Sequence, residues 1–349
     1  MKKSNKCPVF FPKAAEIRQF PMNTPPILSQ EELGCAMQKL RALAAAMNQV
    51  LFGQKDLIEL VLIGVLARGH ILLEGLPGLG KTELVKGLSR ALDITARRVQ
   101  FTPDLLPGDI TGTPVLQERD GTKNFIFQEG PVFANIMLAD EINRASPKTQ
   151  SALLEAMQER RVTVMGRTFT LLPPFFVLAT QNPIEQEGTY PLPEAQLDRF
   201  MFLIEVDYPT EEEEMRIARE TTGTRSEELK HILSGEEIIF YQDLVRRVPV
   251  PEHIYEYAVK LVRATRPTLE TSPEWVKQYV AWGAGPRAVQ FLILGAKTRA
   301  ALQGSYIVRR EDIDAIVEPV LMHRVVTNFA AESQGITPRK AVARLAAEI

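Results

Sequence analysis

Residues 75 to 82 have the composition and spacing of a loop that holds nucleotide phosphates. The segment reads Gly75, Leu76, Pro77, Gly78, Leu79, Gly80, Lys81 and Thr82. A β-rich run, His70–Glu74, precedes it, and a run with apolar residues at helical spacing follows it. This context disfavours an ordinary glycine-rich turn, because here backbone N–H groups and a helix N-terminus point at phosphate oxygens. Lys81 is expected to reach the β- and γ-phosphates and the Thr82 hydroxyl to bind Mg²⁺, so the loop predicts nucleotide binding.

Two adjacent acids follow a second apolar run. The run Ile136–Ala139 is followed directly by Asp140 and Glu141. We expect Asp140 to hold Mg²⁺ through its water shell and Glu141 to orient and polarise the attacking water. A strand capped by solvated acids is the alternative, which the spacing of about 60 residues from the phosphate loop disfavours. No Asn-Lys-x-Asp guanine motif is present, so the pair favours ATP hydrolysis.

A polar strand end and three arginines complete the candidate site. Asn182 follows the apolar run Phe175–Thr180 and could bond the γ-phosphate or the water, or could simply begin a turn. Arg199, after Asp198, suits an arginine finger inserted into a neighbouring subunit, with an ion pair to Asp198 as the alternative. Arg287 lies in the first turn of a helix and could reach back to the phosphate, or could be solvated. Arg144 is a weaker finger candidate.

The composition is that of a folded protein rather than of a disordered or strongly charged one. The chain has 349 residues, 45% of them hydrophobic, and a net charge of −2. Its two cysteines, Cys7 and Cys35, belong to no Cys/His cluster, which disfavours a structural zinc site and favours a reduced, cytoplasmic compartment. The longest apolar run, Leu60–Ala67, is far shorter than the roughly 20 residues of a membrane helix, so we expect no direct membrane contact.

Short apolar runs alternate with helical ones through the first 208 residues. The expected strands are His70–Glu74, Arg98–Phe101, Ile136–Ala139, Phe175–Thr180 and Phe200–Val206. Near-continuous apolar strands separated by helices predict an α/β fold with a parallel sheet covered on both faces. Two apolar stretches break this rhythm, one around Asp120-Gly121 and one around Met165-Gly166-Arg167, and both predict inserted hairpins.

The sequence divides into three parts. Residues 1–33 form a Pro-rich arm, 34–208 the α/β core and 209–349 an all-helical second domain without a convincing strand. Helices are expected early in the core and throughout the last part. Their ranges are Glu31–Met47, Gln54–Arg68, a helix opening at Glu211–Glu214, Glu252–Thr265, Pro286–Leu302, Glu311–His323 and Pro338–Ile349.

Taken together, these motifs resemble the AAA+ ATPases and, more narrowly, their MoxR group. The resemblance covers residues 34–349. It depends on the phosphate loop, Ala139–Gln150, Ala179–Ala195, Leu197–Phe200 and Gly285-Pro286-Arg287. Gly53-Gln54 resembles the segment that lines the adenine pocket in that family, and Gly285 stands where many relatives carry Ser.

The resemblance implies a P-loop core followed by a helical lid, with ATP and Mg²⁺ as cofactors. It implies that Glu141 is the catalytic base, Asn182 the first sensor, Arg287 the second sensor and Arg199 the finger. The two hairpins correspond to the helix-2 insert and the pre-sensor hairpin. The family forms rings, usually hexamers, that act like chaperones on protein clients, typically with von Willebrand factor A domain partners.

Three other functions remain open on the sequence. A nucleic-acid motor would need basic hairpins, but the first hairpin is balanced in charge and the second only mildly basic, so we expect no nucleic acid partner. A metal-chelatase subunit is the second alternative, because such subunits also form rings and act with von Willebrand factor A domain partners. A nucleotide-loaded switch without turnover is disfavoured by the full set Asp140, Glu141 and Asn182.

Overall fold

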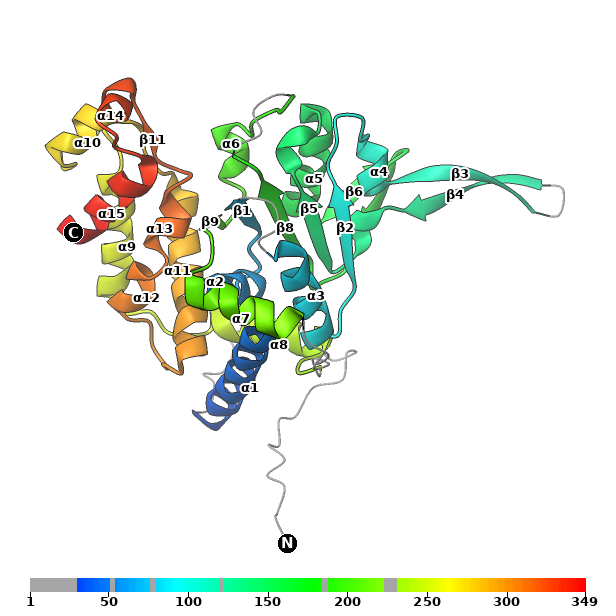
Figure 1. Cartoon of the computed structure of the whole chain (residues 1–349), viewed down its shortest axis with the longest axis horizontal. Helices are drawn as coiled ribbons and strands as arrows, with labels where there is room; N and C mark the ends of the chain where they lie inside the picture. Colours follow the sequence, from blue (N-terminus) through cyan, green and yellow to red (C-terminus); the bar gives the residue numbers. More distant parts are fainter. Residues whose placement is uncertain (1–29, 51–53, 76–79, 120–121, 184–187, 223–230) are drawn as a thin grey trace, which may run out of the picture.

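The computed structural model describes residues 30–50, 54–75, 80–119, 122–183, 188–222 and 231–349 (Figure 1). Most of the expected Pro-rich arm lies outside these ranges, as do the predicted site residues Gly53 and 76–79. The described chain begins with helix α1, Gln30–Val50, followed by α2, Lys55–Leu66. Within the described residues, no helix combines the length and apolar character needed to cross a bilayer.

The centre of the fold is the parallel sheet that the sequence predicts. Its five strands lie in the order β2-β5-β8-β1-β9. All four neighbouring pairs run parallel. The bounds are Ala96–Gln100 for β2, Ile136–Asp140 for β5, Phe176–Gln181 for β8, Ile71–Gly75 for β1 and Phe202–Val206 for β9. The expected strands are confirmed to within two residues.

Strand β2 starts earlier than the apolar pattern indicates. It lies at the edge of the sheet and pairs only with β5. The two residues missed at its start are Ala96 and Arg97, and the exposed side chain of Arg97 does not continue an apolar run. Edge strands commonly carry such charged side chains.

Both faces of the sheet are buried, because alternate residues of each strand enter different cores. Leu73, Leu138 and Leu178 pack with α1, α2 and α3 (Lys81–Ala91). Leu72 and Val177 pack on the other face with α5 (Pro147–Glu159). This two-sided burial explains the near-continuous apolar strands.

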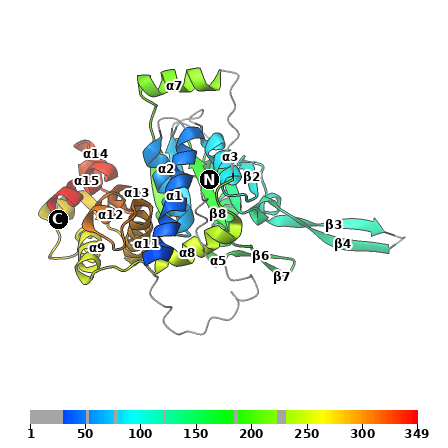
Figure 2. The same ribbon diagram turned by 90° about the horizontal axis from the view of Figure 1, so that it is seen from below.

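Two antiparallel hairpins project from the same side of the core (Figure 2). The first pairs β3, Gly112–Arg119, with β4, Thr122–Glu129, and its turn at 120–121 lies outside the described residues. The second pairs β6, Arg161–Val164, with β7, Arg167–Thr170. The rings of Phe127 and Phe169 stack with centroids 4.2 Å apart and join the two hairpins at their bases.

The remaining chain is mainly helical, and its helices from α9 on lie on the β9 side of the sheet, opposite the first hairpin (Figure 1). Its helices are α7 (Glu211–Thr221), α8 (Gly235–Arg246), α9 (Glu252–Ala264), α10 (Glu274–Tyr279), α11 (Pro286–Gln303), α12 (Arg310–Asp314), α13 (Val317–Leu321), α14 (Phe329–Ser333) and α15 (Pro338–Glu348). The division of the chain near residue 208 stays a prediction, although α7 begins close to it.

Two local expectations for this region are wrong. A short antiparallel pair joins β10, Val280–Trp282, to β11, Val326–Thr327, and two or three residues give no periodic signal. The expected helix Glu311–His323 is split into α12 and α13 around Ile316, which has a φ of −120°. Pro319 lacks the N–H that would bond the carbonyl of Ala315, so a continuous helix is disfavoured there.

Candidate functional site

A cavity of about 250 Å³ opens where β1, β5 and β8 end and α3 begins. Parallel strands bring their carboxyl ends to one edge of a sheet, where helix N-termini also point. The cavity gathers most of the described residues that the sequence predicts for the site. These are Gly75, Gly80, Lys81, Thr82, Asp140, Glu141 and Asn182.

The phosphate-loop side of the cavity is defined by the two described ends of the loop. Position 75 must be a glycine, because a Cβ there would lie 2.7 Å from the carbonyl oxygen of Val206 on β9. Gly80 has a φ of 76°, in the left-handed region that glycine tolerates. Lys81 opens α3, and its Nζ donates to the carbonyl oxygen of Gly75 at 2.7 Å. Burial lowers the pKa of Lys81, while Asp140 and Glu141 act in the opposite direction.

Asp140 is bonded through both carboxylate oxygens. Its Oδ1 accepts from Thr180 Oγ1 at 2.6 Å, and its Oδ2 accepts from Arg98 Nη2 at 2.7 Å. Thr180 and Arg98 come from β8 and β2, which flank β5 on either side. The sheet therefore fixes the carboxylate at the cavity wall.

Glu141 takes a backbone conformation that is rare for a residue with a side chain. Its φ is 56°, which turns the chain sharply after β5. Its backbone N–H donates to Thr180 Oγ1 at 2.9 Å. Its Oε2 accepts from Gln100 Nε2 at 2.6 Å and from Arg144 Nη1 at 3.1 Å. Thr180 thus bonds the side chain of Asp140 and the backbone of Glu141. Arg144 lies beside Glu141 of its own chain.

Sequence reasoning missed Thr180, Arg98 and Gln100 as parts of this site. Thr180 was expected only as a strand residue. Arg98 and Gln100 alternate along β2, so both side chains lie on the same side of that strand. Gln100 is in register with Asp140, which brings it next to the acids. The only signal in the sequence for these two residues is the alternation of polar side chains, Arg98 and Gln100, along β2.

None of the three predicted arginines lines this cavity, although Arg144 bonds Glu141 at its wall. Arg287 Nη1 donates to Asp198 Oδ2 at 2.9 Å, and Arg324 Nε donates to Asp198 Oδ1 at 2.8 Å. In the described part of the chain Asp198 therefore pairs with two distant arginines, and not with its neighbour Arg199. Asn182, by contrast, is buried at the cavity wall.

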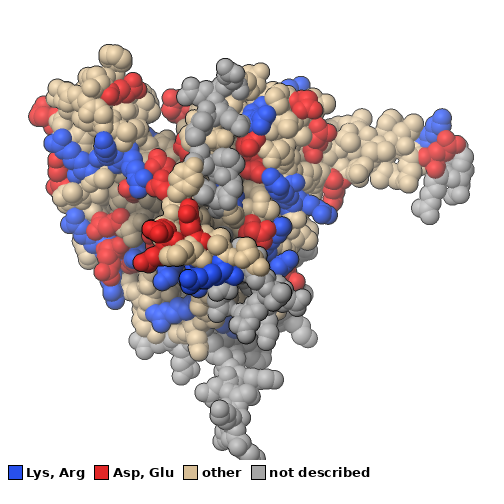
Figure 3. All heavy atoms as spheres, in the orientation of Figure 1, with Lys and Arg blue, Asp and Glu red and all other residues tan. Residues whose placement is uncertain are grey.

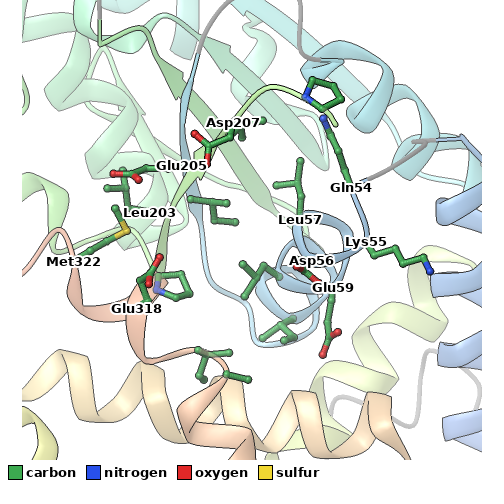
Figure 4. Close-up of a pocket in the computed structure, with 18 of the residues that line it drawn as sticks. Gln54, Lys55, Asp56, Leu57, Glu59, Leu203, Glu205, Asp207, Glu318 and Met322 are labelled. Atoms are coloured by element: carbon green, nitrogen blue, oxygen red, sulfur yellow. The ribbon is translucent and has the colours of Figure 1, made fainter. Parts of the chain in front are cut away.

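Gln54 lines a different and larger cavity of about 1,120 Å³. This cavity lies between α2, β9 and the segments around α7, α12 and α13 (Figure 4). Among the charged side chains of its lining, acidic ones outnumber basic ones, and Glu59, Glu205 and Glu318 are examples. The adenine role of Gln54 stays a prediction, since the structure does not bring Gln54 to the phosphate cavity.

The oxygen atoms in the phosphate cavity fit Mg²⁺. The Thr82 hydroxyl and the Asp140 carboxylate line the same space, and Mg²⁺ prefers one or two protein oxygens together with substrate phosphates. In the residues that the structure describes, no three or more His, Cys, Asp or Glu side chains cluster as a metal site. The donor set therefore suits a metal ion that binds together with a phosphate ligand.

Comparisons with known proteins agree with this geometry. Residues 70–202 match the family model described as "ATPase family associated with various cellular activities (AAA)", and residues 273–345 match the AAA lid domain. The chain is 42% identical to "Chaperone MoxR1" of Mycobacterium tuberculosis, with 93% of this chain and 85% of that protein covered. It is 33% identical to "Protein MoxR" of Paracoccus denitrificans, with 84% and 90% covered.

A solved structure shows the same fold. The crystal structure of a candidate ATPase from Cytophaga hutchinsonii superposes with a TM-score of 0.86 at 40% identity, covering 91% of this chain and 97% of that one. The expected family and fold are thereby confirmed. The chain belongs to the MoxR group of AAA+ ATPases.

Proposed function

We propose that this chain is a ring-forming, Mg²⁺-dependent ATP hydrolase that remodels or matures protein clients. The observation that carries the proposal is the convergence of Lys81, Thr82, Asp140, Glu141 and Asn182 on one cavity at the strand ends. These residues supply a cation for phosphates, oxygen ligands for a metal, a base and a polar sensor.

Each of these side chains has a defined task in the proposed reaction. Lys81 exchanges the carbonyl of Gly75 for a phosphate oxygen of ATP. Glu141 orients the attacking water, and Asn182 bonds that water or the γ-phosphate. A bound Mg²⁺, held by Thr82 and Asp140, would neutralise charge on the phosphate oxygens.

The neighbours of the two acids must move before the reaction. Arg98 bonds Asp140, so a metal ion competes with a guanidinium group for the same carboxylate. Gln100 and Arg144 bond Glu141, which must exchange them for water to act as a base. Arg98 and Arg144 are both partly exposed, so these exchanges need no opening of the core.

Arg199 is proposed to complete the site of a neighbouring subunit. It lies outside the cavity of its own chain, at the end of α6 (Glu194–Leu197), and it forms no ion pair with the described residues. Arg144 bonds Glu141 of its own chain, which supports a role within the subunit and leaves Arg199 as the proposed finger. The relation to MoxR-type ATPases supports assembly into a ring, with six as the expected number.

Mixing two inactive variants tests hydrolysis and assembly together. Glu141→Gln should bind ATP without turnover, and Arg199→Ala should bind ATP with turnover reduced about 10³-fold or more. Mixed rings contain some seams with both an intact Glu141 and a neighbouring intact Arg199, so activity should partly return. Normal turnover by Glu141→Gln would refute the role of that base, and mixtures that stay inactive would refute action between subunits.

A protein client is proposed from the hairpins and from a relative named as a chaperone. Val115, Leu116, Phe125 and Ile126 expose apolar side chains along the first hairpin. Figure 3 shows this shaft mainly free of charge, with both signs near its tip. Nucleic acid would require a basic surface, so the hairpin favours a protein client over the nucleic-acid motor. A von Willebrand factor A domain partner is proposed from the family alone.

A further inference from the structure

One carboxylate joins the sheet to two separate parts of the helical region. Asp198 follows α6 and lies four residues before β9. One of its oxygens accepts from Arg287 in the first turn of α11, and the other accepts from Arg324 beyond α13. Each arginine therefore depends on a different oxygen of the same side chain.

Arg324 is the fixed partner of this pair. Its side chain is 2% exposed. Besides the carboxylate, it donates to the carbonyl oxygens of Asp198 at 3.0 Å and Phe200 at 2.6 Å, and also to Val320. Burial lowers the pKa of Arg324 to about 10, with Asp198 opposing that effect, so the group stays charged at neutral pH. The N–H groups of Arg324 are all engaged at this site. If Arg324 left, buried carbonyl oxygens would lose their hydrogen-bond donors.

Arg287 is the exchangeable partner. Its side chain is 39% exposed, and one hydrogen bond of 2.9 Å holds it to Asp198. The nearby charge of Arg287 also lowers the pKa of Arg324, which shows that the two cations oppose each other. If Arg287 leaves, Asp198 is still neutralised by Arg324. The carboxylate can therefore release one arginine without becoming an unpaired charge.

We propose that Asp198 is a positioning residue that holds Arg287 until a nucleotide phosphate replaces the carboxylate, while Arg324 keeps Asp198 in place. The inference rests on the proposed function, because it requires ATP to bind, and on the expectation from the sequence that Arg287 reaches a phosphate. Asp198 then competes with ATP for one guanidinium group. The exchange also acts next to Arg199, since the two residues are adjacent in the chain.

A double-mutant cycle on ATP affinity tests the competition. Asp198→Asn keeps an oxygen that can accept from Arg324 but replaces the oxygen facing Arg287 by an NH₂ group that cannot accept. We expect Asp198→Asn to bind ATP about two- to fivefold more tightly, as suits the loss of a half-exposed ion pair that competes with the ligand. In an Arg287→Ala background, the same substitution should leave the affinity unchanged.

The outcomes separate this inference from the proposed function. An Asp198→Asn effect of equal size in both backgrounds, or a weaker affinity in both, overturns the exchange and leaves Asp198 with a structural role. Failure of the unaltered chain to bind ATP overturns the proposed function instead. The affinities are measured by calorimetric titration of the full chain at low ionic strength.

A second measurement keeps the test decisive if Asp198→Asn does not fold. The chain has two tryptophans, and Trp282 is 71% exposed on β10, five residues before Arg287. In a Trp275→Phe variant, Trp282 is the sole reporter, and its emission should change on addition of ATP. The change should be absent when Arg287→Ala is added. Unchanged emission in the variant with Arg287, at saturating ATP, contradicts the proposal.

Discussion

Replacing Thr180 by Val should impair turnover much more than ATP binding. Thr180 lies near the end of β8 and is 1% exposed. Its hydroxyl donates to Asp140 at 2.6 Å and accepts from the backbone N–H of Glu141 at 2.9 Å. Valine keeps the branched shape that suits a buried strand, so the substitution removes two hydrogen bonds and little volume.

The size of the effect follows from these two bonds. A hydrogen bond to an ionised carboxylate contributes about 1.5–3 kcal/mol, and a neutral one about 0.5–1.5 kcal/mol. The left-handed backbone of Glu141 costs on the order of 1–3 kcal/mol and depends on its surroundings to persist. If about 1.4–2.8 kcal/mol of this positioning is lost in the transition state, kcat falls about 10- to 100-fold. The Nζ of Lys81 bonds the carbonyl of Gly75 rather than Thr180, so ATP affinity should change less than about threefold.

Steady-state ATPase rates and ATP titrations measure the two quantities separately. Thr180→Ser is the matched control, because it restores the hydroxyl and loses only a methyl group. We expect this control to keep most of the activity. Unreduced kcat in Thr180→Val, or an equal loss in Thr180→Ser, would refute the idea that the hydroxyl positions the two acids.

Three further predictions address the lid, the hairpins and acid stability. Gly283→Ala should lower the thermal midpoint by several degrees because its Cβ would lie 2.4 Å from a backbone carbonyl, whereas Gly285→Ala, with open space around it, should change the midpoint little. Alanine substitutions at Phe127 and Phe169 should show a coupling energy of about 0.5–1.5 kcal/mol in a double-mutant cycle of urea unfolding, and additivity would contradict their stacking. Burial lowers the pKa of His70 from 6.5 to about 4, so the unfolded chain binds a proton that the folded chain excludes. Stability should therefore fall by about 3 kcal/mol between pH 6.5 and pH 4, and His70→Gln should remove that part of the slope in urea titrations.

The sequence was sufficient to predict those parts of the site that depend on one strand and the loop after it. The phosphate loop and the pair Asp140 and Glu141 each follow an apolar run, and parallel strands bring such loops to one edge. The prediction that these residues meet with Asn182 needs no knowledge of strand order beyond a shared sheet. It agrees with the cavity in the structure.

Contacts between distant segments could not be predicted in the same way. Arg98 reaches Asp140 only because β2 lies next to β5, and strand order is set by packing of the whole sheet. Asp198 and Arg324 are 126 positions apart, and no periodicity links them. The break before Pro319, in contrast, can be predicted from the sequence, because proline lacks the N–H that a continuous helix needs there.

The acids and cations of the site differ in how easily they can change partners, and this difference orders the proposed events. Lys81 is held by a carbonyl, and the half-exposed Arg98 holds one oxygen of Asp140, while Thr180 holds the other. Phosphate and metal therefore each displace one accessible side-chain contact, and the bond from Thr180 can stay. Glu141 has two partners, one of them Gln100 at 2.6 Å, and its release requires more rearrangement. ATP should therefore bind before Glu141 is free to act, which leaves time for a neighbouring Arg199 to arrive. The seam between subunits, rather than the phosphate loop, would then control when hydrolysis occurs.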